Sequence, residues 1–326
     1  MDHALDQVID DDVLGLIFTA CHPVLPVEAR IALTLRLIGG LTTAEFARAF
    51  LVPEKTMGQR IFRAKKTLSE AHVAFETPRG EELQRRVMSV LSVVYLIFNE
   101  GYTATSGEEW MRAALCDEAL RLGRMLAQLL PGESEVHALL ALMELNASRT
   151  AARRGSKGEA VLLPYQDRSL WNNAQIQRGM TSLAYAQRLG GEAKYYALQA
   201  AIVACHMRAR TAEETDWGRI VLLYDALMQI APSPIVGLNR AVAVGMTRGP
   251  AAGLDALNGI AAGSNGSALT GYYLLHSVRG DLLMKMGNFR EARVEIERAI
   301  AMTQNLRERE LLENKLKQIQ NADSSA

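Results

Sequence analysis

Three long stretches of this sequence contain no proline, and they are rich in residues that favour an α-helix. The nine prolines leave residues 79–130, 165–231 and 251–326 free of them, and Ala, Leu, Arg, Glu and Met are abundant there. These five residue types have high helix propensity, whereas proline breaks the interior of a helix. No series of alternating apolar and polar residues predicts β-strands. The sequence therefore predicts an all-α fold.

The composition is that of a folded protein without a strongly charged surface. Apolar residues make up 49% of the 326 residues, and 36 basic residues balance 36 acidic ones. This balance excludes a generally basic coat for nucleic acid but leaves room for a local basic patch. The uncharged apolar run from Val87 to Phe98 is too short to cross a bilayer, and the acidic N-terminus is unlike a signal peptide. We therefore expect a cytoplasmic protein with no membrane partner.

A short helix, a tight turn and a longer helix are predicted between residues 42 and 69. Thr42 and Glu45 form a capping-box pattern at the start of the first helix, which is expected to end near Phe50. Pro53 suits the opening of the second helix, which is expected to reach Ser69. On this second helix, apolar residues recur at helical spacing and are expected to face the core: Met57, Ile61, Ala64 and Leu68. The layout is typical of a helix-turn-helix DNA-binding unit.

Basic residues are concentrated on the second of these helices. From Lys55 to Lys66 the sequence has five basic residues and no acidic residue. Arg and Lys neutralise phosphates, and Arg and Gln also form paired hydrogen bonds with base edges. The predicted DNA contacts are Lys55, Thr56, Gln59, Arg60, Arg63 and Lys66. We expect Arg60 and Arg63 to contact bases or phosphates and Lys66 to contact phosphate; the alternative is a solvated charged face on an ordinary helical hairpin.

The C-terminal part contains a pattern of small residues that is typical of paired helices. Five residues stand at spacings like those of a tetratricopeptide (TPR) unit: Gly280, Gly287, Phe289, Ala292 and Ala299. Small side chains at such positions let two helices approach closely. Weaker versions of the pattern occur at residues 199–204 and 239–243. The pattern predicts helical hairpins in this part of the chain.

Several segments resemble one family of bacterial transcription proteins. Residues Arg30–Leu37, Leu41–Ala47 and Arg60–Lys66 resemble region 4 of extracytoplasmic-function RNA polymerase sigma factors. Four further segments resemble the subgroup of these factors with a long C-terminal TPR-like extension: Tyr95–Tyr102, Gln166–Arg168, Thr215–Trp217 and Pro232–Ala241. The resemblance covers nearly the whole chain. It implies a region-4-like helix-turn-helix domain over residues 1–75 and an all-helical extension with TPR-like hairpins over residues 76–326.

The resemblance also implies a function and partners. Region 4 of these factors reads the −35 promoter element and packs against the flap tip of core RNA polymerase, so we expect a role in transcription initiation and no enzymatic activity. The extension is expected to regulate the DNA-binding domain by covering it or by contacting polymerase, a regulatory protein or a small ligand. The competing hypothesis is a TPR-type interaction scaffold whose helix-turn-helix does not bind DNA.

The sequence departs from the family in one respect. It enters region 4 close to its N-terminus, and no segment stands in for region 2, which binds the polymerase clamp and melts the −10 element. The chain is then either truncated or a relative without region 2. In both cases we do not expect it to initiate transcription by itself.

A polar cluster in the extension is a candidate regulatory surface, formed by Gln166, Asp167, Arg168 and Trp171. The alternative is a structural loop in which Asp167 pairs with Arg168 and Trp171 fills a gap. Residues Asn99–Tyr102 are either a ligand site at a helix junction or a simple break at the end of a helix.

No pattern in the sequence predicts catalysis, a metal site or a cofactor. The three cysteines are far apart, and neither a C-x-x-C pair nor an H-E-x-x-H motif occurs. Cys21-His22 and Cys205-His206 are adjacent pairs, but neighbouring side chains on a helix rarely face each other. We therefore expect both pairs to be structural or incidental.

Overall fold

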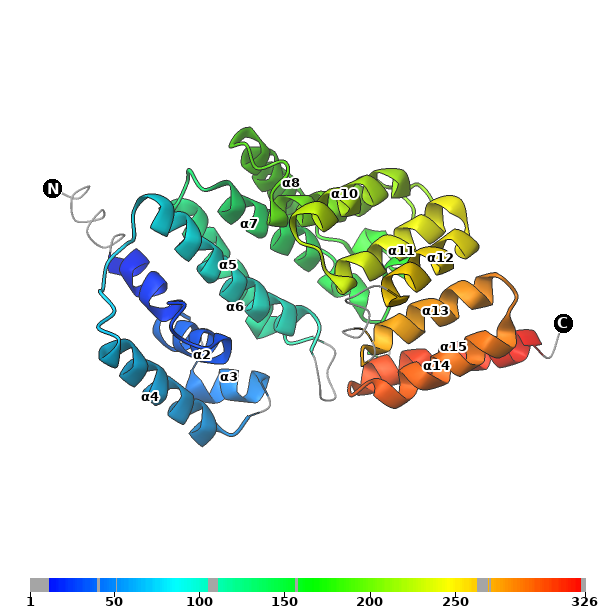
Figure 1. The fold of residues 1–326 in the computed structure, drawn as a ribbon, viewed down its shortest axis with the longest axis horizontal. Coiled ribbons are helices and arrows are strands. Elements are labelled where there is room, and N and C mark those ends of the chain that lie inside the picture. The colour runs from blue at the N-terminus through cyan, green and yellow to red at the C-terminus, as the bar shows by residue number, and fades with distance from the viewer. Residues whose placement is uncertain are drawn as a thin grey trace.

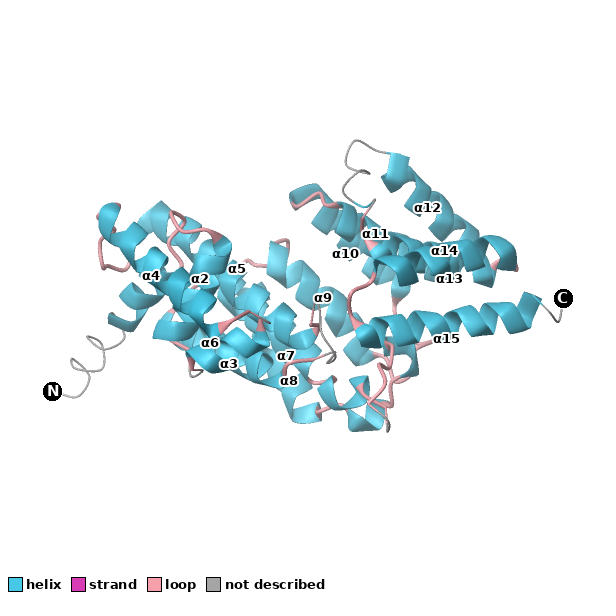
Figure 2. Ribbon diagram, turned by 90° about the horizontal axis from the view of Figure 1, so that it is seen from below, coloured by secondary structure: helices cyan, strands magenta, loops and turns pink. Residues whose placement is uncertain are grey.

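The computed structural model describes residues 12–39, 42–50, 52–104, 111–155, 158–262, 269 and 271–323. Over these residues the protein consists of helices and loops, with a single isolated bridge between Arg154 and Ala160 and no other strand pairing (Figures 1 and 2). This confirms the predicted all-α fold. The first helix covers residues 12–20. The α-helices that follow are α2 Val27–Leu37, α3 Thr43–Ala49, α4 Glu54–Glu70, α5 Gly80–Tyr102, α6 Ala113–Leu129, α7 Ser134–Ala147, α8 Asn173–Arg188, α9 Tyr195–Arg208, α10 Trp217–Ile230, α11 Pro234–Arg248, α12 Pro250–Ala262, α13 Tyr273–Lys285, α14 Phe289–Met302 and α15 Leu306–Asp323. Three short 3₁₀ turns lie between α7 and α8: η1 Thr150–Arg153, η2 Leu163–Tyr165 and η3 Arg168–Leu170.

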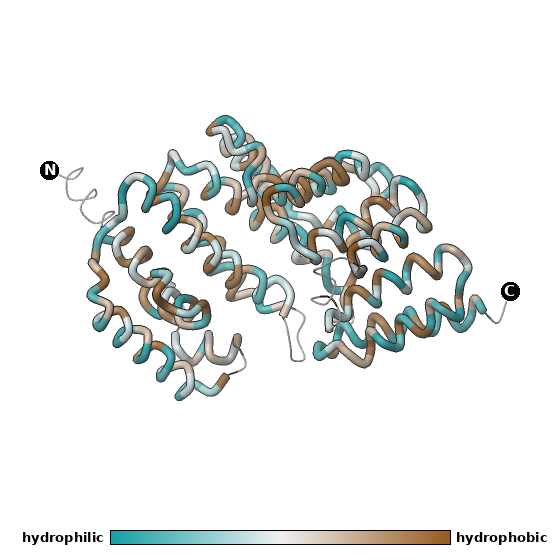
Figure 3. The backbone as a smooth tube through the Cα atoms, in the orientation of Figure 1, coloured by the Kyte–Doolittle hydropathy of each residue, from teal (hydrophilic) through white to brown (hydrophobic). Residues whose placement is uncertain are grey.

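The helices form a curved array in which most of them pack against their neighbours in chain order. The pairs α5/α6, α7/α8, α11/α12 and α13/α14 pack closely, and α7 also packs against α9; α2–α4 lie at one end of the array and α14 and α15 at the other (Figure 1). Hydrophobic residues are concentrated around α10 and α11, whereas α14 and α15 are mainly hydrophilic (Figure 3). Packing between sequential neighbours is typical of helical-hairpin arrays.

The helix-turn-helix region shares its hydrophobic core with the helices that follow it. One continuous cluster of buried residues includes Phe18 and Leu33 of the N-terminal helices, Leu91 and Phe98 of α5, and side chains as far along the chain as Ala204 in α9. Residues 71–79 connect α4 to α5, and the predicted boundary between two domains falls within this link. The two-domain division stays a prediction, but the packing across it is continuous.

The predicted break after Phe98 is wrong, because α5 continues without interruption to Tyr102. Gly101 lies inside this last turn and is buried. A Cβ atom at this position would lie 2.6 Å from the backbone nitrogen of Cys116 in α6. The glycine is therefore required by the close approach of α5 and α6 rather than by a turn.

The C-terminal hairpin of α13 and α14 has the small-residue packing that the sequence predicts. A Cβ atom on Gly280 would lie 2.7 Å from Cδ1 of Ile296, and Ala292 and Ala299 have no exposed surface. Further along, Asn305 donates a hydrogen bond of 3.0 Å from Nδ2 to the carbonyl oxygen of Ala104. This bond ties the start of α15 to the chain just after α5.

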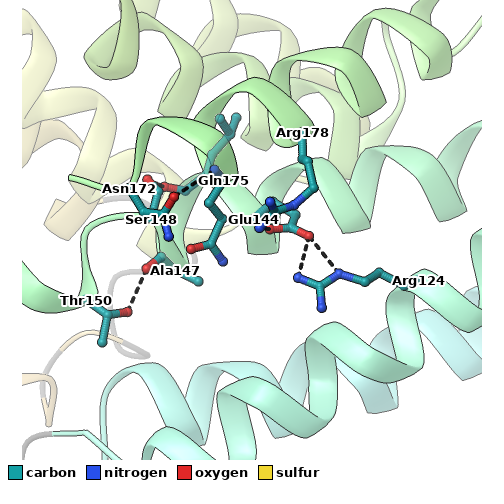
Figure 4. A network of polar contacts seen from close by, with 9 residues as sticks. Arg124, Glu144, Ala147, Ser148, Thr150, Asn172, Gln175 and Arg178 are labelled. Atoms are coloured by element: carbon teal, nitrogen blue, oxygen red, sulfur yellow. Dashed lines mark hydrogen bonds and ion pairs between the residues drawn. The ribbon is translucent and has the colours of Figure 1, made fainter.

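A buried carboxylate joins three helices in the middle of the array. Figure 4 shows Arg124 of α6 and Arg178 of α8 directed toward Glu144 of α7. The Nη2 and Nε atoms of Arg124 lie 2.7 and 2.9 Å from Oε1 of Glu144, and Nη2 of Arg178 lies 3.5 Å from its Oε2. The Glu144 side chain is 2% exposed, whereas the two arginine side chains are 47% and 52% exposed. The ion pairs therefore satisfy a carboxylate that water does not reach.

Candidate nucleic-acid interface

The helix-turn-helix predicted from the sequence is present as α3, a short turn and α4. The capping box at the start of α3 is confirmed: the Glu45 amide donates to Oγ1 of Thr42 at 3.2 Å, and the Thr42 amide donates to Oε2 of Glu45 at 2.6 Å. These two bonds satisfy backbone donors that the first turn leaves without partners. Pro53 immediately precedes α4 with an extended backbone. Leu41, which belongs to one of the segments resembling region 4, lies outside the described residues.

One face of α4 holds the helix against the core. Met57, Ile61 and Ala64 are 3%, 8% and 2% exposed, and Leu68 packs against the same cluster while half-buried. Their positions follow the 3.6-residue period of a helix, so they lie on a single stripe. This confirms the predicted core-facing side of the helix and fixes which side faces outward.

The opposite face of α4 is polar, basic and accessible. The side chains at positions i, i+4, i+8 and i+11 along this face are exposed: Lys55, Gln59, Arg63 and Lys66. Thr56 and Arg60 lie one row to the side and are half-buried. The two glutamates of the helix, Glu54 and Glu70, stand at its ends. All six predicted contact residues thus lie outside the buried stripe, on a surface of about three helical turns.

The charge of this face is little reduced by pairing. Nζ of Lys66 lies 3.6 Å from Oε1 of Glu70, and both side chains are about two-thirds exposed (64% and 65%). An exposed pair of this kind contributes little energy and is weakened by salt, so it exchanges readily for a phosphate. Phe62, also on α4, is 70% exposed and adds an apolar surface beside the basic row.

The C-terminal helices contact this region from the side opposite to α4's outer face. In Figure 1, α4 lies along the outer edge of the molecule, whereas α5 runs past α2. The described residues of the extension therefore do not cover the exposed residues of α4. Covering of the predicted DNA-contact face, one of the ways in which we expect the extension to act, is not the arrangement that the described residues adopt.

Polar bonds that the sequence did not predict join α5 to the N-terminal helices. Arg86 donates from Nη2 to the carbonyl oxygen of Phe18 at 2.6 Å, and Ser89 donates from Oγ to the carbonyl oxygen of Cys21 at 2.7 Å. Arg30 in turn donates from Nη1 to Oγ of Ser89 at 2.8 Å. These partners are 59 or 68 positions apart in sequence, and no local pattern signals such a pairing.

The polar cluster that includes Arg168 lies in the middle of the array, far from α4 in the fold. Asp167 accepts a hydrogen bond of 2.8 Å from the amide of Ser169 and caps η3. Arg168 donates from Nη1 to the carbonyl oxygens of His206 and Ala209, both at 2.8 Å. The predicted pairing of Asp167 with Arg168 is therefore wrong, because the guanidinium caps the C-terminal end of α9 instead.

The other two members of this cluster are buried. Gln166 is 8% exposed and donates from Nε2 to the carbonyl oxygen of Val161 at 3.1 Å. Trp171 is 6% exposed, and the guanidinium carbon of Arg168 lies 4.4 Å from the centre of its ring. Gln166 and Trp171 thus contribute packing rather than a polar surface, whereas Arg168 also lines a cavity described below.

The adjacent Cys–His pair at the end of the first helix does not form a reactive site. Sγ of the buried Cys21 lies 3.2 Å from Oγ1 of Thr34, and Nδ1 of His22 accepts a bond from the amide of Val24. Burial raises the pKa of the Cys21 thiol to about 11. Within the described ranges, no group of three or more His, Cys, Asp or Glu side chains has the geometry of a metal site.

Two stretches of the chain match known family models. Residues 16–68 match the family model "Sigma-70, region 4", and residues 86–187 match the "Family of unknown function (DUF6596)". The first match covers α2, α3 and nearly all of α4, and the second covers the region from α5 to α8. No helix in the described part of the chain is long and apolar enough to span a membrane.

Together, the helix-turn-helix and the region 4 match define a sigma-factor-like protein with a helical C-terminal part. The chain is 45% identical over 298 residues to "Uncharacterized protein R00370" of Rhizobium meliloti (strain 1021), a match that covers 91% of this chain and 69% of that protein. The chain therefore belongs to the same family as that protein.

Proposed function

We propose that this protein is an RNA polymerase sigma factor of the extracytoplasmic-function type, in which the outer face of α4 reads the −35 promoter element. The single observation that carries the proposal is the uncovered basic face of α4 on a region 4 helix-turn-helix. A helix of this length fits the major groove, and its arginine, lysine and glutamine side chains supply both phosphate and base contacts.

Within this proposal, the six residues have different roles. Arg63 and Gln59 stand on the most exposed row of α4 and contact base edges or phosphates, together with the flanking Arg60. Lys55, Thr56 and Lys66 position the helix on the phosphate backbone. Core RNA polymerase, contacted through its flap tip, is the protein partner, and the helical C-terminal part regulates the complex in the cytoplasm.

The test is a salt titration of the full chain against a fluorescent −35-like DNA duplex, with a scrambled duplex of equal length beside it. The full chain is used because α4 shares its core with α5–α9. Each phosphate contact contributes about −0.9 to the slope of log affinity against log salt. We expect Lys66→Ala to lower the magnitude of that slope by about one on both duplexes.

The arginine substitution distinguishes a specific contact from a general one. Loss of a base contact costs about 1–3 kcal/mol of discrimination, so Arg63→Ala is expected to reduce the preference for the −35-like duplex by about fivefold or more. Arg290→Ala is the matched control, because Arg290 is an exposed arginine on α14, at the other end of the array. The proposal fails if the full chain does not bind at low salt, or if both α4 variants behave like the Arg290 variant.

A further inference from the structure

Three segments that the sequence analysis singled out separately meet at one cavity in the C-terminal part. The cavity has a volume of about 440 Å³ and is bounded by η2, α9, α10 and α11. The first segment contributes Arg168, the second contributes Thr215 and Trp217, and the third contributes Asn239. His206 completes the polar part of the wall. Helix packing brings these residues together across more than 70 positions of sequence.

Apart from the hydroxyl of Tyr224, the remainder of the wall is apolar. It is formed by Leu162, Leu163, Pro164, Ala212, Ile220, Val242 and the ring of Tyr224. A cavity of this size, mostly apolar and with a few polar groups on one side, is the usual form of a site for a small organic molecule. The apolar wall favours binding of a ligand with a hydrocarbon body. The charge and hydrogen-bonding groups of the polar side determine which head group on that ligand binds well.

The polar side of the cavity is positively charged. Arg168 uses Nη1 for its two carbonyl bonds, and across the described residues neither Nε nor Nη2 forms a hydrogen bond with the protein. The carboxylates of Glu213 and Glu214 favour the charged form of this guanidinium, but both residues are exposed, and within the described residues neither forms an ion pair with it. Arg168 therefore retains donors for an acceptor inside the cavity.

A second arginine, Arg149, is not one of the lining residues, but its charge acts on two of them, Arg168 and His206. Arg149 is 8% exposed, donates from Nη2 to Oδ1 of Asn146 at 2.8 Å, and leaves Nε without a partner. In the part of the chain that the structure describes, Arg149 has no ion pair. A buried cation without a counter-ion is unfavourable, and a bound anion would relieve that cost. The positive charges of Arg149 and Arg168 add to burial in lowering the pKa of His206 to about 4, so this histidine is neutral at pH 7.

Two other residues of the wall carry polar atoms that the protein does not satisfy. Thr215 is 6% exposed, and among the residues that the structure describes its Oγ1 has no hydrogen-bond partner. Nε1 of Trp217 is likewise buried without a partner. Most buried polar atoms in folded proteins are paired, so an unpaired donor and an unpaired hydroxyl at one cavity point to a missing ligand.

We propose that this cavity binds a small organic anion, a molecule with an apolar body and one carboxylate or sulfonate group directed at Arg168. The body lies against the wall formed by α10 and α11, and the guanidinium of Arg168 pairs with the head group. The inference concerns the C-terminal part alone and holds whether or not α4 binds DNA.

A neighbouring cavity of about 500 Å³ shares Tyr224 and Asn239 with the first but has a different character. Its polar residues are the neutral side chains of Tyr95, Asn99, Asn146, Tyr195, Gln199, Tyr224, Ser233 and Asn239. None of the described residues that line it is charged. The anionic head group therefore belongs to the Arg168 cavity.

The test uses two fluorescent probes of nearly the same shape. 1-Anilinonaphthalene-8-sulfonate carries the proposed anionic group on an apolar body, and N-phenyl-1-naphthylamine has the same body without the charge. With the full chain, we expect one sulfonate probe bound per protein, about tenfold more tightly than the neutral probe, because hydrogen bonds to charged groups are the stronger kind. Equal affinity for the two probes would overturn the proposal.

Substitutions then locate the bound probe. Arg168→Met should weaken binding of the sulfonate probe about tenfold and leave the neutral probe unchanged, whereas Val242→Trp should abolish binding of both by filling the cavity. Arg290→Met is the matched control and should change neither. Because Arg168 also caps α9, Arg149→Met provides a second variant that leaves those bonds intact, and we expect it to weaken binding of the sulfonate probe about threefold. Sulfonate binding that survives Val242→Trp, or that is equal in the Arg149, Arg168 and Arg290 variants, would refute the site.

Discussion

The buried carboxylate at the junction of α6, α7 and α8 leads to an asymmetric prediction about stability. Removing one partner of a buried ion pair costs about 3–5 kcal/mol, because the remaining charge stays buried. Glu144 is the buried member, at 2% exposure, and Arg124 supplies its two short bonds. Arg124→Met should therefore destabilise the protein by about 3 kcal/mol, at the low end of the range because Arg178 remains 3.5 Å away.

The other two substitutions should cost much less. Arg178→Met removes only the longer contact, and we expect a loss of about 1 kcal/mol. Glu144→Gln removes the charge but keeps the shape and one acceptor, and both arginine side chains, about half exposed, then turn to water. We expect that change to cost about 1 kcal/mol as well. The double variant Arg124→Met/Glu144→Gln should be more stable than Arg124→Met alone, by about 2 kcal/mol.

Urea unfolding followed by circular dichroism at 222 nm measures these differences as shifts of the midpoint. Arg293→Met is the control, because Arg293 pairs with Glu297 at 2.8 Å on an exposed face of α14 and should change stability by less than about 0.5 kcal/mol. The reasoning is refuted if Arg124→Met and Arg178→Met have equal effects, or if Glu144→Gln does not rescue Arg124→Met. Either result would mean that water reaches the carboxylate and that the network contributes like a surface pair.

Three further predictions follow from the geometry. Gly101→Ala should destabilise the protein by about 1–2 kcal/mol, because the added Cβ would meet the backbone of α6 at 2.6 Å. Gly58→Ala should instead stabilise the protein by about 0.5–1 kcal/mol, because Gly58 lies in α4 with open space around it. The midpoints of urea unfolding distinguish the two results. The lowered pKa of His206 means that, between pH 6.5 and about 4, the unfolded chain binds a proton that the folded chain does not. The free energy of unfolding should therefore fall by up to about 3 kcal/mol over this pH range. Urea unfolding at each pH measures this loss, and His206→Gln should remove it. Thr42→Ala should cost about 1 kcal/mol and speed hydrogen exchange at the Glu45 amide; an unchanged exchange rate would show that the capping bond contributes nothing in solution.

The parts of the fold that depend on local chemistry could be predicted from the sequence. The stripe of Met57, Ile61 and Ala64 follows from the helical period alone, and the capping box of Thr42 and Glu45 depends on residues only three positions apart. Both are present as expected. Because this stripe faces the core, the basic side chains on the other positions of α4 must face outward.

The features that depend on distant contacts could not be predicted. Gly101 is expected to break a helix, because helix propensity depends only on its missing side chain. In the structure, an added Cβ would come closest to the backbone of α6, a helix that begins twelve residues later. Arg168 was expected to pair with the acidic residue beside it, yet it bonds to carbonyl oxygens 38 and 41 positions away. In both cases the packing of helices, which no local pattern encodes, supplied the partner.

Helix α5 connects the two regions for which functions are proposed. In its first half, Arg86 and Ser89 bond to the carbonyl oxygens of Phe18 in the first helix and of Cys21 just after it. Two to three turns further on, Tyr95 and Asn99 line the neutral cavity that shares Tyr224 and Asn239 with the Arg168 cavity. A continuous helix is stiff along its axis, so a displacement at one of these points moves the other. If the extension regulates the region 4 domain as proposed, we therefore expect it to act through the packing of α5 against α2, on the side away from the outer face of α4.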